Sequence, residues 1–564
     1  MDKRKTENVI PIIDLFAGPG GLGEGFSSLI DENNERVFKI RLSIEKDEHA
    51  HQTLKLRSFF RQFKPGKVPE DYYTFVRGGM TIDELYKKYP KEATHSDEEA
   101  WCGTLGIPDK DDKNGVSNED VDERIKVALA GNTKWLLIGG PPCQAYSLAG
   151  RSRRKETILD STKDKRVDLY KEYLRIIAVH SPAIFVMENV KGLLSAKTEE
   201  ENIFRRILND LSDPVTACLS EGEKITKKNP ATKYRIYSLT TETTEFDSDG
   251  NPIFNPKDFL IKAEDYGIPQ KRHRIILLGV REDCPSPEGT LEKSDQVSLE
   301  SVIGKLPPVR SGITRLFSHS TIEKDNEGNP KKKRHYIKVK DSYENWLSYV
   351  NDFDKELDGF IGSSEHHVNT DWPTTLGREF WPSQRPHIDA SHQLESWYKD
   401  KKLAGILHHV SRKHLIDDLK RYLFASRYTS QKGTFPRLED YKLAGNNLLP
   451  DHENAESGKF SDRFRVQLPD IPATTVTSHI SKDGHYFIHY DSVQCRSFTV
   501  REAARVQTFP DNYFFCGERT QQFHQVGNAV PPFLAFQIAN VVHKIFQRRE
   551  TESVKKGTKN EILM

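Results

Sequence analysis

The stretch VIPIIDLFAGPGGLGEGF, residues Val9–Phe26, predicts how the chain begins to fold. Apart from Asp14, the residues up to Phe16 are apolar, which is typical of a buried strand, and the glycines after them predict a tight turn into a short helix. A second strand is expected at Phe38–Glu45 and a helix at Lys46–Phe60. A strand, a glycine-rich turn, a helix and a second strand, in this order, indicate an open α/β sheet with helices on both faces.

Three later segments extend the predicted sheet. Lys134–Gly140, Ala183–Val190 and Arg272–Val280 are short, mostly apolar runs, so we expect each to be a strand. Between residues 66 and 122 the chain is polar, charged and weakly periodic. We therefore expect an insertion on the sheet at about 66–122.

The chain changes character after Pro308. Aromatic, histidine and charged residues follow without a repeat, and they include the basic run PKKKRHYIK at Pro330–Lys338. We expect a sheet domain at 1–308, a smaller domain of mixed structure at 309–490, and a return to the sheet domain at 491–564, with a charged tail. A helix near the end is expected to have four apolar residues on one face, namely Leu534, Ile538, Val541 and Ile545.

The overall charge indicates no class of partner. The 564 residues include 84 Lys and Arg against 83 Asp and Glu, a formal net charge of +1, so binding to nucleic acid would depend on local basic patches. The six cysteines form no CxxC pair and no zinc-ligand spacing. No signal peptide and no run of about 20 apolar residues is evident. We expect an intracellular protein with free thiols, no metal and no membrane segment.

The stretch LLIGGPPCQAYSLAGRSRR (Leu136–Arg154) contains an unusual cysteine. Two prolines before Cys143 block regular backbone hydrogen bonding, and two glycines before them allow a turn or a close approach. The thiol is therefore expected at a strand end, on a stiff turn and next to positive charge. The alternative is a structural cysteine buried on a tight turn.

Other candidate residues follow or begin predicted strands. Residues two apart on a strand point the same way, so we expect Arg272 and Arg274 to face one pocket together with Glu188 and Cys143. Taken singly, Glu188 is also explained as a surface carboxylate or a helix cap, and the arginines as a solvated basic edge. The glycine-rich turn, likewise, serves helix–strand packing as readily as a ligand. The combination in one sheet favours a functional site.

Six motifs occur along the chain in this order: DLFAGPGGLGEGF, GGPPCQAYS, MENV, DYGIPQKRHR, RSFTVREAARVQTFPD and QVGNAVPP. In their residues and their order they resemble the motifs of the DNA (cytosine-5) methyltransferase family. The resemblance implies a Rossmann-like sheet that binds S-adenosylmethionine, with the catalytic core at 1–308 and 491–564. It also implies a target recognition domain at 309–490 and methylation of carbon 5 of a cytosine flipped out of duplex DNA.

The resemblance further implies covalent catalysis. The Cys143 thiolate would add to carbon 6 of cytosine, after which carbon 5 is able to attack a methyl sulfonium. Nearby arginines would favour the thiolate. Glu188 would hydrogen-bond ring nitrogen 3 and Arg274 the ring carbonyl oxygen, whereas Arg272 is expected to hold Glu188 and the pocket in place.

Two sets of binding residues are implied as well. The residues expected to bind S-adenosylmethionine are Phe16, Gly18, Gly20, Gly21, Glu45, Pro142, Leu169 and Asn528. Among them, Phe16 would stack on the adenine, the glycines would lie along the amino acid part, and Glu45 would hold the ribose. The residues expected to contact DNA phosphates, from a loop that closes over DNA, are Ser147, Arg151, Arg153, Arg154 and Lys155. A solvated charged loop is the alternative for that segment.

A tRNA cytosine methyltransferase and a DNA-binding protein without catalysis are the rival functions. The tRNA branch shares the motifs, but the large 309–490 region favours DNA because reading a groove needs added surface, and the CFT tripeptide of that branch is absent. An inactive protein would have lost Cys143 or Glu188, and both are present. We expect a monomer in the bacterial cytoplasm, associated with the nucleoid through double-stranded DNA. A cognate restriction endonuclease is a candidate partner.

Overall fold

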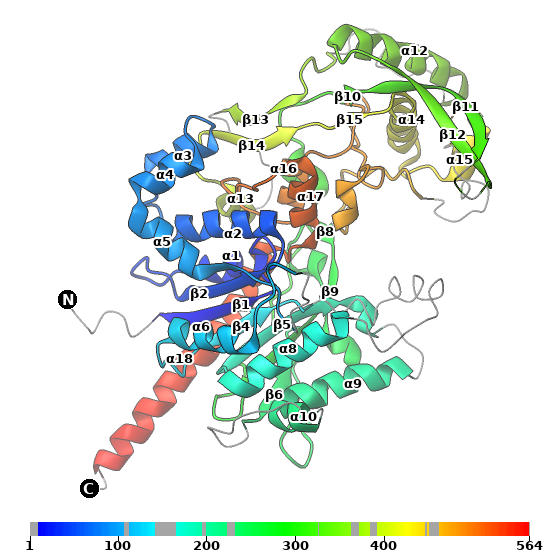
Figure 1. Ribbon diagram of the computed structural model, residues 1–564. Helices are drawn as coiled ribbons and strands as arrows, with labels where there is room; N and C mark the ends of the chain where they lie inside the picture. The colour runs from blue at the N-terminus through cyan, green and yellow to red at the C-terminus, as the bar shows by residue number, and fades with distance from the viewer. Residues whose placement is uncertain are drawn as a thin grey trace.

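The computed structural model describes residues 9–106, 112–141, 165–194, 199–220, 222, 232–324, 326, 328–361, 371–383, 392–445, 448–449 and 462–562. Its centre is an eight-stranded sheet in the order β3-β2-β1-β4-β5-β9-β6, with β7 also paired to β9 (Figure 1). The strands are β1 (Ile10–Leu15), β2 (Phe38–Glu45), β3 (Ala100–Cys102), β4 (Leu136–Gly139), β5 (Ile184–Val190), β6 (Tyr234–Tyr237), β7 (Leu260–Lys262) and β9 (His273–Arg281). β1 to β5 pair in parallel, and β9 runs antiparallel to β5, β6 and β7.

The sequence of β1 explains why the sheet is buried on both faces. Ile10 and Ile12 pack into one hydrophobic core, and Ile13 and Leu15 pack into a second core on the other face. Successive side chains of a strand point to opposite faces, so a nearly continuous apolar run requires cover on both. The prediction of an α/β sheet with helices on both faces is therefore confirmed.

Different helices build the two cores. The first core contains residues of α1 (Gly21–Ser27), α11 (Leu299–Ile303), α16 (Val500–Val506), α17 (Arg519–Asn528) and α18 (Pro532–Ile562). The second contains residues of α6 (Asn118–Leu129), α8 (Lys165–His180), α9 (Glu199–Ser212) and α10 (Pro214–Ser220). The four apolar residues predicted for one face of the last helix all lie in the first core. The stretch Arg519–Thr551 is long and apolar enough to span a membrane by composition alone, but 72% of its most apolar window is buried against the protein's own core.

The segment 66–122 differs from the expected insertion, because part of it belongs to the central sheet. It contains helices α3 (Glu70–Val76), α4 (Ile82–Lys88) and α5 (Pro90–Glu99), and then β3, which pairs in parallel with β2. α5 packs on α2 (Glu48–Arg61). Three residues, AWC, are too few to show strand periodicity, and this is why the sequence does not reveal β3.

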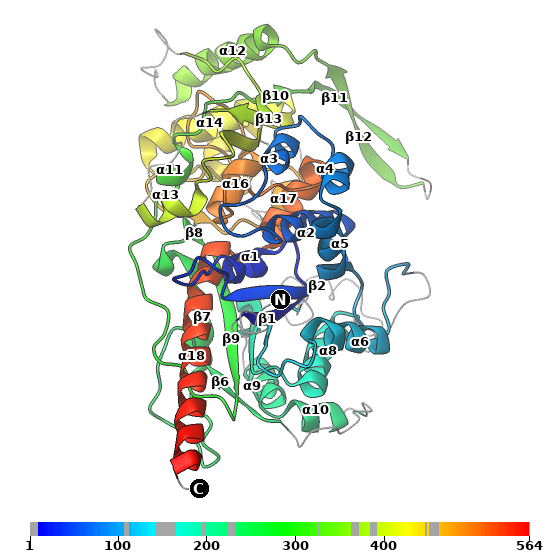
Figure 2. The same cartoon turned by 90° about the vertical axis from the view of Figure 1, so that its left-hand side faces the viewer.

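The region 309–490 contains its own core and also adds to the cores around the sheet. Its helices are α12 (Tyr343–Ile361), α13 (His392–Tyr398), α14 (Ile416–Lys432) and α15 (Leu438–Leu443). Its strands form pairs: β10 (Gly312–Ile313) with β15 (Lys413–His414), β11 (Arg315–Lys324) with β12 (Pro330–Lys338), and β13 (Gly377–Pro382) with β14 (Gly405–Val410). β16 (Ala473–Thr474) pairs instead with β8 (Gln270–Lys271). Figures 1 and 2 show this region above the sheet, with β11 and β12 projecting as a two-stranded ribbon.

The hydrophobic cores do not coincide with the expected boundaries of the region 309–490. Trp346, Leu419 and Phe464 lie in a separate core, whereas Ile406 and Val476 lie in the first core beside the sheet. The boundaries at 308 and 490 therefore stay predictions.

A close contact between β5 and β9 fixes their alignment. Phe185 lies directly opposite Gly279, and a Cβ atom at Gly279 would lie 2.0 Å from Cζ of Phe185. The phenyl ring thus occupies the space that any other side chain at residue 279 would need. Glycine in the interior of a strand is explained here by this close approach.

We predict that Gly279→Ala lowers the free energy of unfolding by about 1–3 kcal/mol, because the added methyl group forces the Phe185 ring or the backbone to move. Urea denaturation measures the change. Gly359→Ala in α12 is the matched control, since no atom lies within 4 Å of a Cβ there; we expect an unchanged or slightly increased stability. Equal stability of Gly279→Ala and wild type would contradict the packing described.

Candidate functional site

One edge of the sheet borders a cavity of about 580 Å³. The carboxyl ends of parallel strands meet at the same edge, and β9 runs antiparallel to them, so its beginning lies at that edge as well. The predicted site residues that line the cavity are Phe16, Gly18, Glu45, Leu169, Glu188, Arg272, Arg274 and Asn528. The structure therefore brings these eight residues together, and their individual roles stay predictions.

Glu188 and Arg274 form an ion pair at the cavity wall. Nε of Arg274 lies 2.8 Å from Oε1 of Glu188, and the two side chains are 16% and 14% exposed. Oε2 of Glu188 lies against Gly140, where it would be 3.0 Å from an added Cβ. A Cβ atom at residue 140 would therefore displace the carboxylate by a few tenths of an ångström. The expectation that Arg272 holds Glu188 is wrong in this respect, because the ion pair is made by Arg274.

Arg272 supports the pocket through the backbone instead. Its guanidinium is buried, and Nη1 donates to the carbonyl oxygens of Val476 at 2.8 Å and Gly527 at 3.4 Å. Burial lowers the pKa of Arg272. Val476 precedes two residues that line the cavity, and Gly527 lies at the end of α17. The second half of the expectation, that Arg272 holds the pocket in place, stays a prediction.

Glu45 ends β2 with its carboxylate fixed by two backbone donors. Oε2 accepts a hydrogen bond from the amide of Gly18 and Oε1 accepts one from the amide of Asp47, both at 2.8 Å. Burial raises the pKa of Glu45. The carboxylate retains lone pairs for further donors, so it is oriented to accept hydroxyl groups from a ligand in the cavity.

The glycine-rich turn divides into a cavity part and a packing part. Phe16 and Gly18 line the cavity and have positive φ angles of 56° and 58°. Gly20 and Gly21 are not among the residues that line it, and their expected place along the cofactor stays a prediction. A Cβ at Gly20 would lie 2.9 Å from Leu54, and one at Gly21 would lie 2.3 Å from the carbonyl oxygen of Val530. These two glycines therefore serve close packing, which was the alternative explanation of the turn.

Several residues that line the cavity are not predicted from the sequence. Thr477 and Ser478 were placed by sequence in another domain, and no motif marks them. His524 lies one helical turn before Asn528, with ring nitrogens 3.3 and 3.4 Å from Nδ2 of that residue. The i, i+4 spacing beside the QVGNAVPP motif was the available signal for His524.

Seven predicted residues lie outside the described part of the chain: Pro142, Cys143, Ser147, Arg151, Arg153, Arg154 and Lys155. Pro141, the last described residue before them, lines the cavity. The five described cysteines form no disulfide bond with one another. Within the described residues, no three His, Cys, Asp or Glu side chains are grouped as metal ligands would be.

Asp14 is a buried carboxyl just behind the cavity, two residues before Phe16. It has no exposed surface, and neither carboxylate oxygen has a hydrogen-bond partner among the described residues. Burial raises the pKa of Asp14 to about 8, although Arg61 acts in the opposite direction. The folded protein therefore holds a proton on this group at neutral pH.

The matches to known proteins cover most of the chain. The family model described as C-5 cytosine-specific DNA methylase matches residues 110–214 and 237–544. The type II methyltransferase M.Bpa9945I of Bacillus paralicheniformis is 30% identical over 556 residues, which cover 95% of this chain and 98% of that protein. The type II methyltransferase M.DdeI of Desulfomicrobium norvegicum is 24% identical over 551 residues, covering 95% and 89%. The DNA (cytosine-5-)-methyltransferase M.ApeKI of Aeropyrum pernix is 25% identical over 444 residues, covering 76% and 84%.

We predict a pH-dependent contribution of Asp14 to stability. The folded-state pKa of about 8 lies above that of an unfolded aspartate, so this contribution is complete below about pH 3.9 and is lost as the pH rises towards 8. Between pH 5 and 7, wild type should lose about 1.4 kcal/mol per pH unit more than Asp14→Asn. Urea denaturation at each pH measures both slopes. Asp249→Asn, at an exposed position, should keep the wild-type slope; the same slope in Asp14→Asn would show that Asp14 is already ionised.

Proposed function

The chain belongs to the C-5 cytosine-specific DNA methylase family, and from this membership we propose that it methylates carbon 5 of a cytosine within a specific sequence of duplex DNA. The observation that supports the proposal most is the Glu188–Arg274 pair in a cavity that also contains Glu45 and Asn528. The cavity thereby combines groups suited to a base with groups suited to a nucleoside.

The residues of the cavity fit S-adenosylmethionine. Its volume of about 580 Å³ is in the range of small-molecule sites. The oriented carboxylate of Glu45 is suited to the ribose hydroxyls, and Phe16 provides an aromatic surface for the adenine. Leu169 and Asn528 complete the binding set. When bound, S-adenosylmethionine supplies an electrophilic methyl group.

Cys143 is the nucleophile in the proposed mechanism. Its sulfur forms a bond to carbon 6 of the cytosine, and the electron pair of the 5,6 double bond becomes available at carbon 5 to take the methyl group. A base then removes the proton from carbon 5, and the sulfur leaves as the double bond re-forms. The covalent step divides one difficult substitution into easier ones.

Glu188 and Arg274 stabilise the ring while the sulfur adds. The ion pair uses Oε1 of Glu188, so we assign Oε2, on the side of Gly140 and Pro141, to the hydrogen bond with ring nitrogen 3. For this bond the carboxyl group is protonated at Oε2 and donates to the nitrogen, which has no hydrogen of its own. The Arg274 guanidinium retains donors for the ring carbonyl oxygen. Preorganised donors at the place where charge develops are an effective form of electrostatic catalysis. Arg272 acts as a positioning residue through the backbone of Val476 and Gly527.

The remaining proposals concern the surroundings of the reaction. The residues that contact DNA phosphates from the segment after Cys143 are Ser147, Arg151, Arg153, Arg154 and Lys155. The positive charge of the last four supports this role. The protein acts as a monomer in the cytoplasm, at the nucleoid where its substrate lies. Its relatives' names support a place in a restriction-modification system, and its partner there would be an endonuclease cutting the same unmethylated sequence. We propose that no metal takes part.

We predict that expression in bacteria without cytosine methylation produces 5-methylcytosine at one short sequence of the genome, detectable by bisulfite sequencing. Cys143→Ser, expressed in parallel, should leave no methylcytosine, because a hydroxyl is a far weaker nucleophile for this addition. Purified wild type that binds S-adenosylmethionine and leaves every genomic cytosine unmodified would overturn the DNA substrate. Methylcytosine confined to RNA would favour the tRNA-modifying alternative.

Two carboxyl-to-amide variants distinguish the role of Glu188 in the reaction from the role of Glu45 in cofactor binding. Glu188→Gln should lower kcat by about 10²–10³-fold with little change in cofactor affinity, because the lost interaction belongs to the transition state. Glu45→Gln should weaken binding of S-adenosylmethionine about 10- to 100-fold, as expected for a lost charged hydrogen bond, with a much smaller effect on kcat. Isothermal titration and methyl-transfer assays measure the two quantities. The reverse pattern would exchange the assigned roles.

A further inference from the structure

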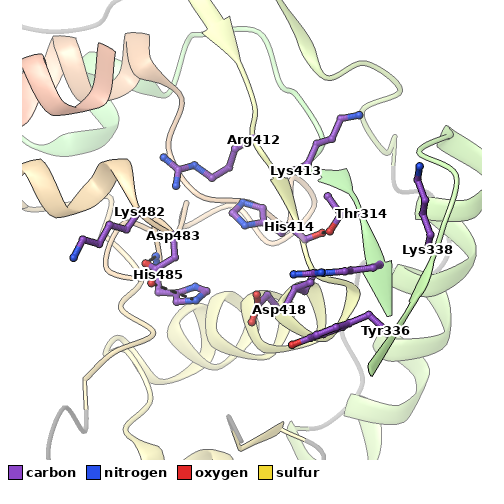
Figure 3. A pocket seen from close by; sticks show the side chains of 12 residues that line it. Thr314, Tyr336, Lys338, Arg412, Lys413, His414, Asp418, Lys482, Asp483 and His485 are labelled. Carbon is purple, nitrogen blue, oxygen red and sulfur yellow. Dashed lines mark hydrogen bonds and ion pairs between the residues drawn. The ribbon is translucent and has the colours of Figure 1, made fainter. Parts of the chain in front are cut away.

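A second cavity, of about 640 Å³, lies in the region 309–490 at the base of the β11–β12 ribbon. Its basic side chains come from three separate parts of the chain, and we call them the basic cleft: Arg315, Lys338, Arg412, Lys413 and Lys482. Figure 3 shows Lys338 and Lys482 on opposite sides of it. Cations therefore lie on both walls of the cleft.

The acidic groups of this cavity are already paired. Asp418 lies 2.8 Å from Arg421 and Asp483 lies 3.4 Å from Arg463, two arginines that do not line the cleft. Lys413 is itself paired with Asp341 at 3.2 Å. The other four basic side chains thus face two carboxylates whose charge is largely balanced elsewhere. A cleft with this excess of positive charge attracts a polyanion.

The register of the ribbon extends the basic cleft along one face. Directly opposite residues of an antiparallel pair share a face, so Arg315 and Lys338, and further out Ser320 and Arg334, point the same way. We call this the basic face, and its charged residues are Arg315, Lys324, Lys332, Arg334 and Lys338. Among its described residues it contains no acidic side chain.

The opposite face of the ribbon has a different composition. Lys333 and Glu323 form an ion pair at 2.9 Å, and the rings of His319 and His335 stack at 4.6 Å. Its positive charge is therefore partly balanced on the ribbon itself. The base of the basic face is also ordered, because the guanidinium of Arg315 lies 4.2 Å from the centre of the Tyr336 ring.

A short segment connects the basic cleft with the cavity at the edge of the sheet, which we call the catalytic cavity. Thr477 and Ser478 line the catalytic cavity, and Lys482 lines the basic cleft. Two buried arginines hold the segment between them: Arg272 donates to the carbonyl oxygen of Val476 at 2.8 Å, and Arg412 donates to that of Ile480 at 2.7 Å. The two cavities are thus fixed relative to each other.

We propose that the basic cleft and the basic face of the ribbon bind the sugar-phosphate backbone of the duplex whose cytosine enters the catalytic cavity. The inference rests on the proposed function and assigns the DNA contact to one face of β11–β12. Phosphate contacts fix the position and orientation of a protein on DNA. The cleft contributes Lys338 and Lys482 to the phosphates, and the ribbon continues along the backbone.

Four lysines of β12, all exposed, provide the test. Lys332→Gln with Lys338→Gln removes two charges from the basic face, and Lys331→Gln with Lys333→Gln removes two from the opposite face. Binding to a fluorescein-labelled duplex of mixed sequence is measured by anisotropy over a range of salt concentrations. The first pair should weaken binding at least about 10-fold in 0.1 M salt and reduce the slope of log K against log salt by about 1.8. The second pair should stay near wild type.

Each outcome of the binding measurement either supports or overturns the inference. Equal losses in both double variants would indicate attraction by overall charge and would overturn the inference, as would wild-type binding by the first pair. Methyl transfer and titration with S-adenosylmethionine on the same preparations keep the two proposals apart. If wild type binds the duplex but does not methylate it, the proposed function fails while the face assignment is still tested. If wild type does not bind duplex DNA, both fail.

Discussion

The pairing register of β5 and β9 is the constraint on which the catalytic cavity depends. Phe185 lies opposite Gly279, and this alignment places Val190 opposite Arg274. Because a shift by one residue turns every side chain to the other face of a sheet, such a shift would turn Arg274 away from the face of Glu188. The Phe185 ring over Gly279 excludes the neighbouring registers by volume. A contact in the hydrophobic core thus determines where the charged pair forms.

The other side of the cavity depends on contacts between the C-terminal and the N-terminal parts of the chain. Gly21 and Gly25 of α1 lie so close to the carbonyl oxygens of Val530 and Pro532 that a Cβ atom at either glycine would meet them at 2.3 and 2.4 Å. Oγ1 of Thr53 donates to Oε1 of Gln525 at 2.6 Å in the same region. These contacts place Asn528 across the cavity from the turn after β1. No single motif therefore contains the site, which exists only when distant segments are packed.

The sequence predicts those parts of the fold whose signal is local. Phe38–Glu45 has the bounds predicted for it, because the alternation of apolar residues with polar or charged ones is recognisable as a strand by itself. The sequence also places Arg272 and Arg274 on one side of a strand. It does not predict which of them reaches Glu188, since that depends on the alignment of two antiparallel strands far apart in the chain. The same holds for Gly20, whose packing partners are defined only by the tertiary structure.

The segment from Val476 to Lys482 links the basic cleft to the catalytic cavity at a limited distance. Six residues of extended chain reach at most about 20 Å, which is less than one turn of duplex DNA at about 34 Å. A phosphate at Lys482 and a base beside Thr477 would therefore belong to the same turn of the duplex. Arginine suits the fixing of such a segment, because its planar guanidinium stays charged and holds a carbonyl oxygen at a defined angle. Arg272 and Arg412 each hold one carbonyl oxygen of the segment, so its backbone joins the proposed phosphate site to the catalytic cavity.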